Sequence, residues 1–163
     1  MVTNCSFNNG GKSLNGCLVS GPNSLNSLLD VLLRFRSYAC GLQYDLSKAY
    51  NSMRTGLKER HLRRFVWRFS KDSPWIDYAF DVVHFGDKCA ATQLEVAKDL
   101  IADMGREIDP VAADRIQDDI YVDDGISGGS YEEVQRFKGI KNPDGYFSGT
   151  IPQIFAKGNF NPI

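Results

Sequence analysis

The strongest constraint on the fold is the stretch Ile-Tyr-Val-Asp-Asp-Gly-Ile at residues 120–126. β-Branched and aromatic residues favour a pleated strand, whereas the Asp-Asp-Gly that follows them favours a tight turn. The pattern predicts a β-hairpin with two adjacent carboxylates, Asp123 and Asp124, at its tip. Neighbouring carboxylates repel each other, and a divalent cation that prefers oxygen ligands would relieve this repulsion. A solvated turn without a ligand is the alternative that this stretch alone leaves open.

Another acid ends a second predicted strand. Residues 41–46 alternate in polarity, and Asp45 points away from the face that carries Leu42 and Tyr44. An acid at the end of a core strand is costly for stability, and strand ends are where many sites are built. Capping of the following helix is the alternative role for Asp45.

Residues 54–71 are basic and aromatic, with seven Lys or Arg against one acid. In contrast, residues 107–124 hold seven acids against one base. Arginines interleaved with aromatic rings can bind phosphates and stack on bases. A solvated helix that leads into an amphipathic strand is the alternative. The arginines in question are Arg60, Arg63, Arg64 and Arg68, and the rings are Phe65, Trp67 and Phe69.

The remaining elements follow from periodicity and turn signals. A helix of about three turns begins near residue 23, and we expect its leucines to lie in the core. Strands flank a turn at residues 71–74, and helices follow at residues 94–105, 111–115 and 131–137. Thr92 and Ser130 each begin a capping-box pattern. We expect Gly128 and Gly129 to form a loop, and no clear element after Gly139.

Length and composition indicate one globular unit of 163 residues. The four cysteines are widely spaced and accompany only two histidines, which indicates neither a zinc site nor a disulfide framework. No run approaches about 18 apolar residues and no signal pattern begins the chain, so we expect an intracellular protein without a membrane partner. The order of elements predicts an α+β fold, an antiparallel sheet with helices packed on one face.

Six residues, Asp-Leu-Ser-Lys-Ala-Tyr at 45–50, precede Tyr-Val-Asp-Asp at 121–124. The two blocks resemble the first and third catalytic motifs of reverse transcriptases. Further blocks at residues 13–18, 21–22, 31–36, 64–68 and 83–86 are similar, in the same order, to the Bel/Pao class of long-terminal-repeat retrotransposons. The resemblance covers nearly the full chain. One departure is that Ala90-Ala91 stand where the family's second motif usually has Ser-Pro.

The resemblance implies an incomplete polymerase palm of the reverse transcriptase fold. Residues 1–40 would form part of the fingers and a leading helix, and residues 41–138 the palm. Residues 139–163 would lead toward the missing remainder of the palm and the thumb. The rest of such a polyprotein, including thumb, ribonuclease H and integrase, is absent, so the fragment alone is not expected to polymerise. The implied location is cytoplasmic, with virus-like particles as an alternative.

The same resemblance assigns roles to individual residues. Asp45 and Asp123 would bind two Mg²⁺ ions, with Mn²⁺ as an alternative, and Asp124 would complete this catalytic and metal-binding set. The substrates would be a deoxynucleoside triphosphate and an RNA or DNA template-primer. Tyr50 would reject ribonucleotides by crowding the sugar, although a buried helix aromatic is its alternative role. The implied nucleotide-binding residues are Tyr50, Phe85, Gly86 and Tyr121, and the arginines at 60, 63, 64 and 68 would bind the nucleic acid.

A second hypothesis belongs to a different class. The chain could be a non-catalytic remnant that acts as a nucleic-acid-binding module, in which Arg60, Arg63, Arg64 and Arg68 act with Trp67 and the acids are incidental. Salt-dependent binding that survives Asp123→Asn would favour this hypothesis. A metal-dependent phosphohydrolase is disfavoured, because nothing near the acids supplies a nucleophile or general base.

Overall fold

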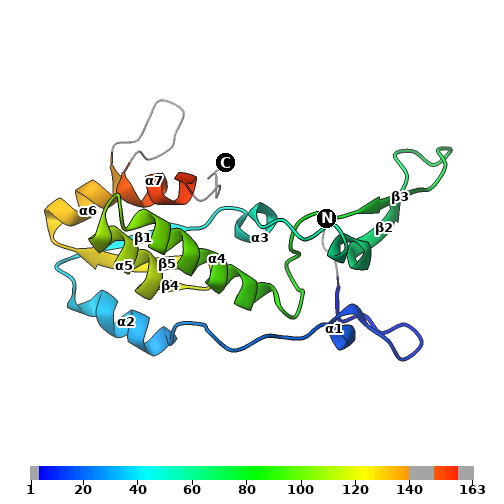
Figure 1. The fold of residues 1–163 in the computed structure, drawn as a ribbon, viewed down its shortest axis with the longest axis horizontal. Coiled ribbons are helices and arrows are strands. Elements are labelled where there is room, and N and C mark those ends of the chain that lie inside the picture. Colours follow the sequence, from blue (N-terminus) through cyan, green and yellow to red (C-terminus); the bar gives the residue numbers. More distant parts are fainter. Residues whose placement is uncertain (1–3, 140–148, 158–163) are drawn as a thin grey trace. The chain divides into compact units, whose positions relative to one another are not determined.

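The computed structural model describes residues 4–139 and 149–157 (Figure 1). The chain divides into two compact units. Unit 1 comprises residues 1–20 and 50–90, and unit 2 comprises residues 21–49 and 91–163. The mixed α+β class and the antiparallel pairing are confirmed, but the strands form two small sheets where one was expected. The predicted C-terminal segment at 139–163 lies mostly outside the described residues.

Unit 2 is built on a three-stranded antiparallel sheet. Its strands are β1 (Cys40–Asp45), β4 (Ile120–Tyr121) and β5 (Asp124–Gly129), in the order β1-β5-β4. The predicted hairpin at residues 120–126 is confirmed by the pairing of β4 with β5. The prediction of a loop at Gly128 and Gly129 is wrong, because both residues continue β5. A Cβ atom at Gly128 would overlap the Cys40 carbonyl and the Tyr38 side chain, so close packing explains this glycine.

Helix α2 (Leu28–Ser37) confirms the predicted leading helix but not its orientation. It begins after Ser27, whose hydroxyl accepts a hydrogen bond from the Asp30 amide. Val31 is 0% exposed, whereas the leucines point outward. The prediction that the leucines form core is therefore wrong for Leu28, Leu29, Leu32 and Leu33, all of which are exposed.

Unit 2 also contains α5 (Pro110–Asp118) and all of α4 (Ala90–Gly105) except its first residue. Because α4 begins at Ala90, Thr92 lies inside the helix and the predicted capping box there is wrong. Glu95 is instead buried and accepts a hydrogen bond from Lys98 Nζ at 2.5 Å. Helix α5 is longer than predicted and is capped by the carboxylate of Asp109.

The last two helices are α6 (Tyr131–Lys138) and α7 (Thr150–Lys157). The capping box at Ser130, which begins α6, is confirmed. Helix α7 was missed from the sequence, yet it buries Ile151, Ile154 and Phe155. Ile154 fills the space that a side chain at position 105 would need, so Gly105 at the end of α4 permits this packing.

Unit 1 contains α1 (Leu14–Cys17), most of α3 (Ala49–Ser52), a 3₁₀ helix η1 (Glu59–Arg63), β2 (Arg64–Trp67) and β3 (Ile76–Ala79). The predicted hairpin around residues 71–74 is confirmed by the antiparallel pairing of β2 with β3. The ring of Phe65 stacks on those of Tyr78 and Phe80, and buried His84 packs edge-on against Phe80. In the described part of the chain, no helix is long and apolar enough to cross a membrane.

Candidate functional site

Three aspartates meet at one end of the unit 2 sheet. Asp45 is the last residue of β1 and lies opposite Asp124, the first residue of β5. The backbone amide of Leu46 donates to the Asp123 carbonyl at 2.9 Å, which continues the pairing beyond the strand ends. Asp45 and Asp123 are 78 positions apart in the sequence. The sheet therefore brings together aspartates that were predicted from two separate motifs.

This arrangement is unfavourable for stability when no cation is bound. Directly opposed side chains in an antiparallel pair have Cβ atoms about 4.5–5.5 Å apart, and like charges at this distance destabilise the pair. Asp45 and Asp124 are exposed, whereas Asp123 is partly buried. Burial raises the pKa of Asp123 above its ordinary value, and the charges of Asp124 and Asp45 raise it further. A hydrogen bond from the backbone amide of Asp123 offsets part of this rise.

The tip of the hairpin is strained. Tyr121 pairs with Asp124, so Val122 and Asp123 form a two-residue turn. Val122 has a φ of 60°, a conformation that a β-branched residue rarely adopts. Such strain persists only where the surrounding contacts fix the backbone, and it is common at functional sites. The turn thus holds Asp123 beside β1 at a cost in backbone energy.

Packing beneath the tip explains the glycine that follows the acids. Gly125 lies between Tyr44 on β1 and Ile120 on β4. A Cβ atom at Gly125 would overlap the Tyr44 ring. Burial raises the pKa of the Tyr44 hydroxyl, and the charge of Asp119 adds to this effect. The Tyr44 side chain is therefore neutral, and its ring packs against Gly125 next to the acidic end of the sheet.

The donor chemistry at this end fits a hard divalent cation, because all three side chains offer only oxygen. Mg²⁺ is usually bound by one or two carboxylates, while waters and substrate phosphates complete its coordination. Within residues 4–139 and 149–157, no three His, Cys, Asp or Glu side chains are grouped so that they could hold a metal ion. Any cation at this end of the sheet would therefore need ligands besides these side chains, such as waters or substrate phosphates.

The predicted nucleotide-binding residues divide between the units. Tyr121 lies in the same cross-strand row as Asp124 and Asp45 in unit 2. Tyr50, Phe85 and Gly86 belong to unit 1, where the rings of Tyr50 and Phe85 meet edge to face with centroids 5.7 Å apart. Unit 2 therefore places Tyr121 near the aspartates, and unit 1 places Tyr50 beside Phe85.

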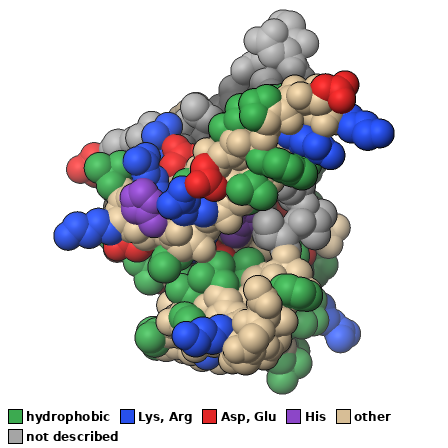
Figure 2. Space-filling view, turned by 90° about the vertical axis from the view of Figure 1, so that its right-hand side faces the viewer, with side chains coloured by type: hydrophobic (Ala, Val, Ile, Leu, Met, Phe, Trp, Pro, Cys, Tyr) green, Lys and Arg blue, Asp and Glu red, His purple; other side chains and the backbone are tan. Residues whose placement is uncertain are grey.

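The four predicted nucleic-acid-binding arginines have different environments in unit 1. The side chain of Arg63 is only 4% exposed, and its guanidinium pairs with Asp87 at 2.6 Å. Arg64 forms an ion pair with Asp77 on β3, and Arg68 lies over the ring of Trp75. Arg60 is exposed on η1. Arg63 thus supports the fold of unit 1, while the other three arginines are at least partly exposed, as are Trp67 and Trp75. Figure 2 shows hydrophobic, Lys and Arg side chains interspersed on one face of the molecule.

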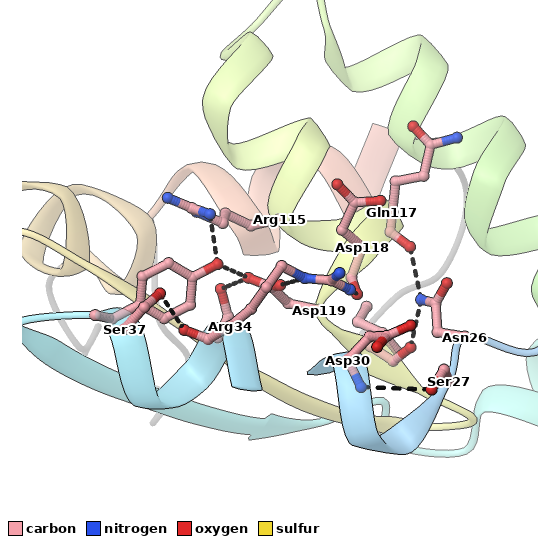
Figure 3. Close-up of polar contacts among 12 residues, drawn as sticks. Asn26, Ser27, Asp30, Arg34, Ser37, Arg115, Gln117, Asp118 and Asp119 are labelled. Atoms are coloured by element: carbon pink, nitrogen blue, oxygen red, sulfur yellow. Dashed lines mark hydrogen bonds and ion pairs between the residues drawn. The ribbon is translucent and has the colours of Figure 1, made fainter. Parts of the chain in front are cut away.

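Sequence reasoning missed one polar cluster in unit 2. Asp119 is completely buried directly before β4, and its carboxylate accepts hydrogen bonds from Arg34, Tyr38 and Ser127 (Figure 3). In the sequence, Asp119 is one of seven acids between residues 107 and 124, and nothing distinguishes it from its exposed neighbour Asp118. Its burial arises from α2, which is far away in the sequence.

No family model matches the chain, and no match was found among the curated proteins or the solved structures.

Proposed function

We propose that the chain carries the catalytic centre of an RNA-directed DNA polymerase from a Bel/Pao-type retrotransposon, with a fold of the polymerase palm type. The observation that carries this proposal is the meeting of Asp45 with Asp123 and Asp124 at one sheet end. A shared ligand gives a reason to pair like charges across two strands and to strain Val122 beside them. The motifs around both acids resemble those of reverse transcriptases, which supports a metal-bound nucleotide as this ligand.

In the proposed reaction, a primer 3′-hydroxyl attacks the α-phosphate of a deoxynucleoside triphosphate, and pyrophosphate leaves. Two Mg²⁺ ions, when bound, would stabilise the charge that develops on the attacking and leaving oxygens. Asp45 and Asp123 would hold these ions, and Asp124 would add negative charge beside them. Tyr121, in the same cross-strand row as Asp124 and Asp45, would face the nucleotide. The same proposal includes a template-primer and other segments of a polyprotein as partners, and a cytoplasmic location.

A second candidate function is supported by the surface of unit 1. Its exposed tryptophans, Trp67 and Trp75, lie on the hairpin that also carries Arg64 and Arg68. Aromatic rings with adjacent arginines bind single-stranded nucleic acid by stacking and charge. In this alternative, the chain is a non-catalytic remnant that binds nucleic acid through unit 1.

Titration of the full chain with Mn²⁺, a spectroscopic substitute for Mg²⁺, tests the proposal. Electron paramagnetic resonance of the free ion should reveal saturable binding. Asp45→Asn and Asp123→Asn should each weaken this binding at least about tenfold, which corresponds to 1.4 kcal/mol. Asp118→Asn removes the same charge from an exposed neighbouring position and should leave the affinity unchanged.

Two results would contradict the polymerase proposal. One is the absence of saturable Mn²⁺ binding by the unmodified chain. The other is binding that is equally strong in Asp45→Asn, Asp123→Asn and the Asp118→Asn control. If the chain nevertheless bound a primer-template in a salt-dependent and metal-independent way, the remnant alternative would be favoured.

A further inference from the structure

The Asp119 cluster consists of Arg34, Tyr38, Arg115, Asp119 and Ser127, all in unit 2. The buried Asp119 carboxylate accepts three hydrogen bonds, from Arg34 Nε at 3.0 Å, from the Tyr38 hydroxyl at 2.8 Å and from the Ser127 hydroxyl at 2.7 Å. Arg115 Nη1 donates in turn to the Tyr38 oxygen, and its guanidinium lies over the Tyr38 ring. The buried charge is thus fully hydrogen-bonded, with two arginines beside it (Figure 3).

Asp119 connects both strands of the acidic hairpin at its base. It follows α5 and directly precedes β4, and its own backbone amide donates to the Arg115 carbonyl. Its carbonyl accepts a hydrogen bond from the Ile126 amide at 2.9 Å, while its carboxylate binds Ser127. Ile126 and Ser127 both lie on β5. One residue therefore closes the hairpin through its backbone and through its side chain.

Two residues from the N-terminal part of unit 2, Asn26 and Arg34, bind the backbone at the base of the hairpin. Arg34 also donates to the Asp118 carbonyl. Asn26 Nδ2 donates to the carbonyls of Gln117 at 2.8 Å and Ile120 at 2.9 Å (Figure 3). These bonds hold the backbone at residues 117–120 in place, which is the segment that leads into β4.

We propose that Asp119 is a positioning residue that holds Asp123 beside Asp45, an inference that rests on the proposed metal site. Replacing a buried ion pair by apolar residues is often neutral or stabilising, so stability alone is a weak reason for a buried aspartate. The tip of the hairpin gives another reason for the buried aspartate, because Val122 is strained there and Asp45 lies opposite Asp124. A fixed base limits how far the strained tip can relax, and so helps the bond between Leu46 and Asp123 to keep Asp123 beside β1.

Asp119→Asn is the direct test, because it keeps the side-chain shape and removes the charge that binds Arg34. Loss of a residue that orients metal ligands typically weakens metal binding 10- to 100-fold, and we expect a loss in this range for Mn²⁺. Ser127→Ala removes one of the three hydrogen bonds and should weaken binding by about tenfold, at the lower end of that range. Asp118→Asn is the matched control and should bind Mn²⁺ as the unmodified chain does.

Paramagnetic broadening separates positioning from simple stabilisation. In the unmodified chain, Mn²⁺ should broaden the amide NMR signals of Asp45 and Asp123 together. In folded Asp119→Asn, at least about tenfold more Mn²⁺ should be needed to broaden both signals, whereas a residue that only stabilises the fold would leave this requirement unchanged. Ser127→Ala provides the same readout if Asp119→Asn does not fold.

The outcomes separate this inference from the proposed function. If the unmodified chain binds no Mn²⁺, or if Asp123→Asn binds it equally well, the metal site fails and the inference with it. If the unmodified chain binds Mn²⁺ through Asp123, but folded Asp119→Asn and Ser127→Ala bind it equally well, only the positioning role is overturned. A loss of stability without a change in Mn²⁺ affinity would reduce Asp119 to a structural residue.

Discussion

At the scale of single residues, Asp123 shows how a candidate site opposes stability. Burial and the charges of Asp124 and Asp45 raise its pKa in the folded chain above the unfolded value of about 3.8. The folded state therefore binds this proton more tightly than the unfolded state. Stability then falls as pH rises through the window between the two pKa values, and ionised Asp123 destabilises the fold at neutral pH.

Asp123→Asn should consequently raise the urea midpoint of unit 2 at pH 7. The gain should shrink as pH falls through the folded pKa of Asp123 and vanish below the unfolded pKa, where the carboxyl is protonated in both states. Far-ultraviolet circular dichroism is the suitable probe, because Trp67 and Trp75 both lie in unit 1. Asp118→Asn is the control, and an equal gain from it would show that general charge reduction causes the effect.

Gly125 gives a second prediction at this scale. Gly125→Ala should destabilise unit 2 by about 1–3 kcal/mol, because the new methyl group overlaps the Tyr44 ring. The measurement is urea unfolding of Gly125→Ala, Tyr44→Ala and the double variant. The alanine at 125 should cost less when the ring is absent, and additive effects would exclude the overlap as the cause.

Residue chemistry allowed part of the site to be predicted from sequence. Asp123 and Asp124 stand out because of the turn that carries them, and Asp45 because of its place at a strand end. Their proximity was expected only from the resemblance to reverse transcriptases, since no spacing rule pairs positions 45 and 123. Asp119 could not be predicted, because burial by α2 is a tertiary effect that leaves no local pattern.

At the scale of elements, α2 shows why periodicity alone can select the wrong face. Four leucines outweigh one valine in any apolar pattern, yet Val31 is buried and Leu33 is 57% exposed. The same face also carries Arg34, which donates a hydrogen bond to Asp119 and favours this rotation of the helix. Helix α7 was missed for a related reason, because its eight residues follow a segment rich in Gly and Pro.

The orientation of α2 predicts an inverted substitution pattern. Val31→Ala should lower the free energy of unfolding of unit 2 by roughly 1.5–3 kcal/mol, since the side chain is completely buried. Leu33→Ala removes a larger side chain from an exposed position and should change this free energy by no more than about 0.5 kcal/mol. Urea unfolding of both variants provides the measurement. A larger loss for Leu33→Ala would mean that the leucine face is covered in solution.

At the scale of the whole molecule, the near-neutral net charge hides a division between the two units. Unit 1 contains nine Lys or Arg and five Asp or Glu, a net charge of +4. Unit 2 contains ten Lys or Arg and fifteen Asp or Glu, a net charge of −5. A basic unit attracts phosphates, whereas an acidic unit attracts cations. We therefore expect nucleic acid to bind unit 1 and the metal ion to bind unit 2.

This division predicts that the two binding activities can be separated by single substitutions. Without metal, Arg60→Ala should weaken primer-template binding and reduce the slope of log affinity against log salt by about one, because one phosphate contact is lost. Arg36→Ala removes the same charge from an exposed position on α2 in unit 2 and should leave the slope unchanged. Fluorescence anisotropy of a labelled primer-template across a salt series measures both. Asp123→Asn should preserve this metal-free binding while it weakens Mn²⁺ binding, whereas a joint loss of the two activities would show that the units do not bind their ligands independently.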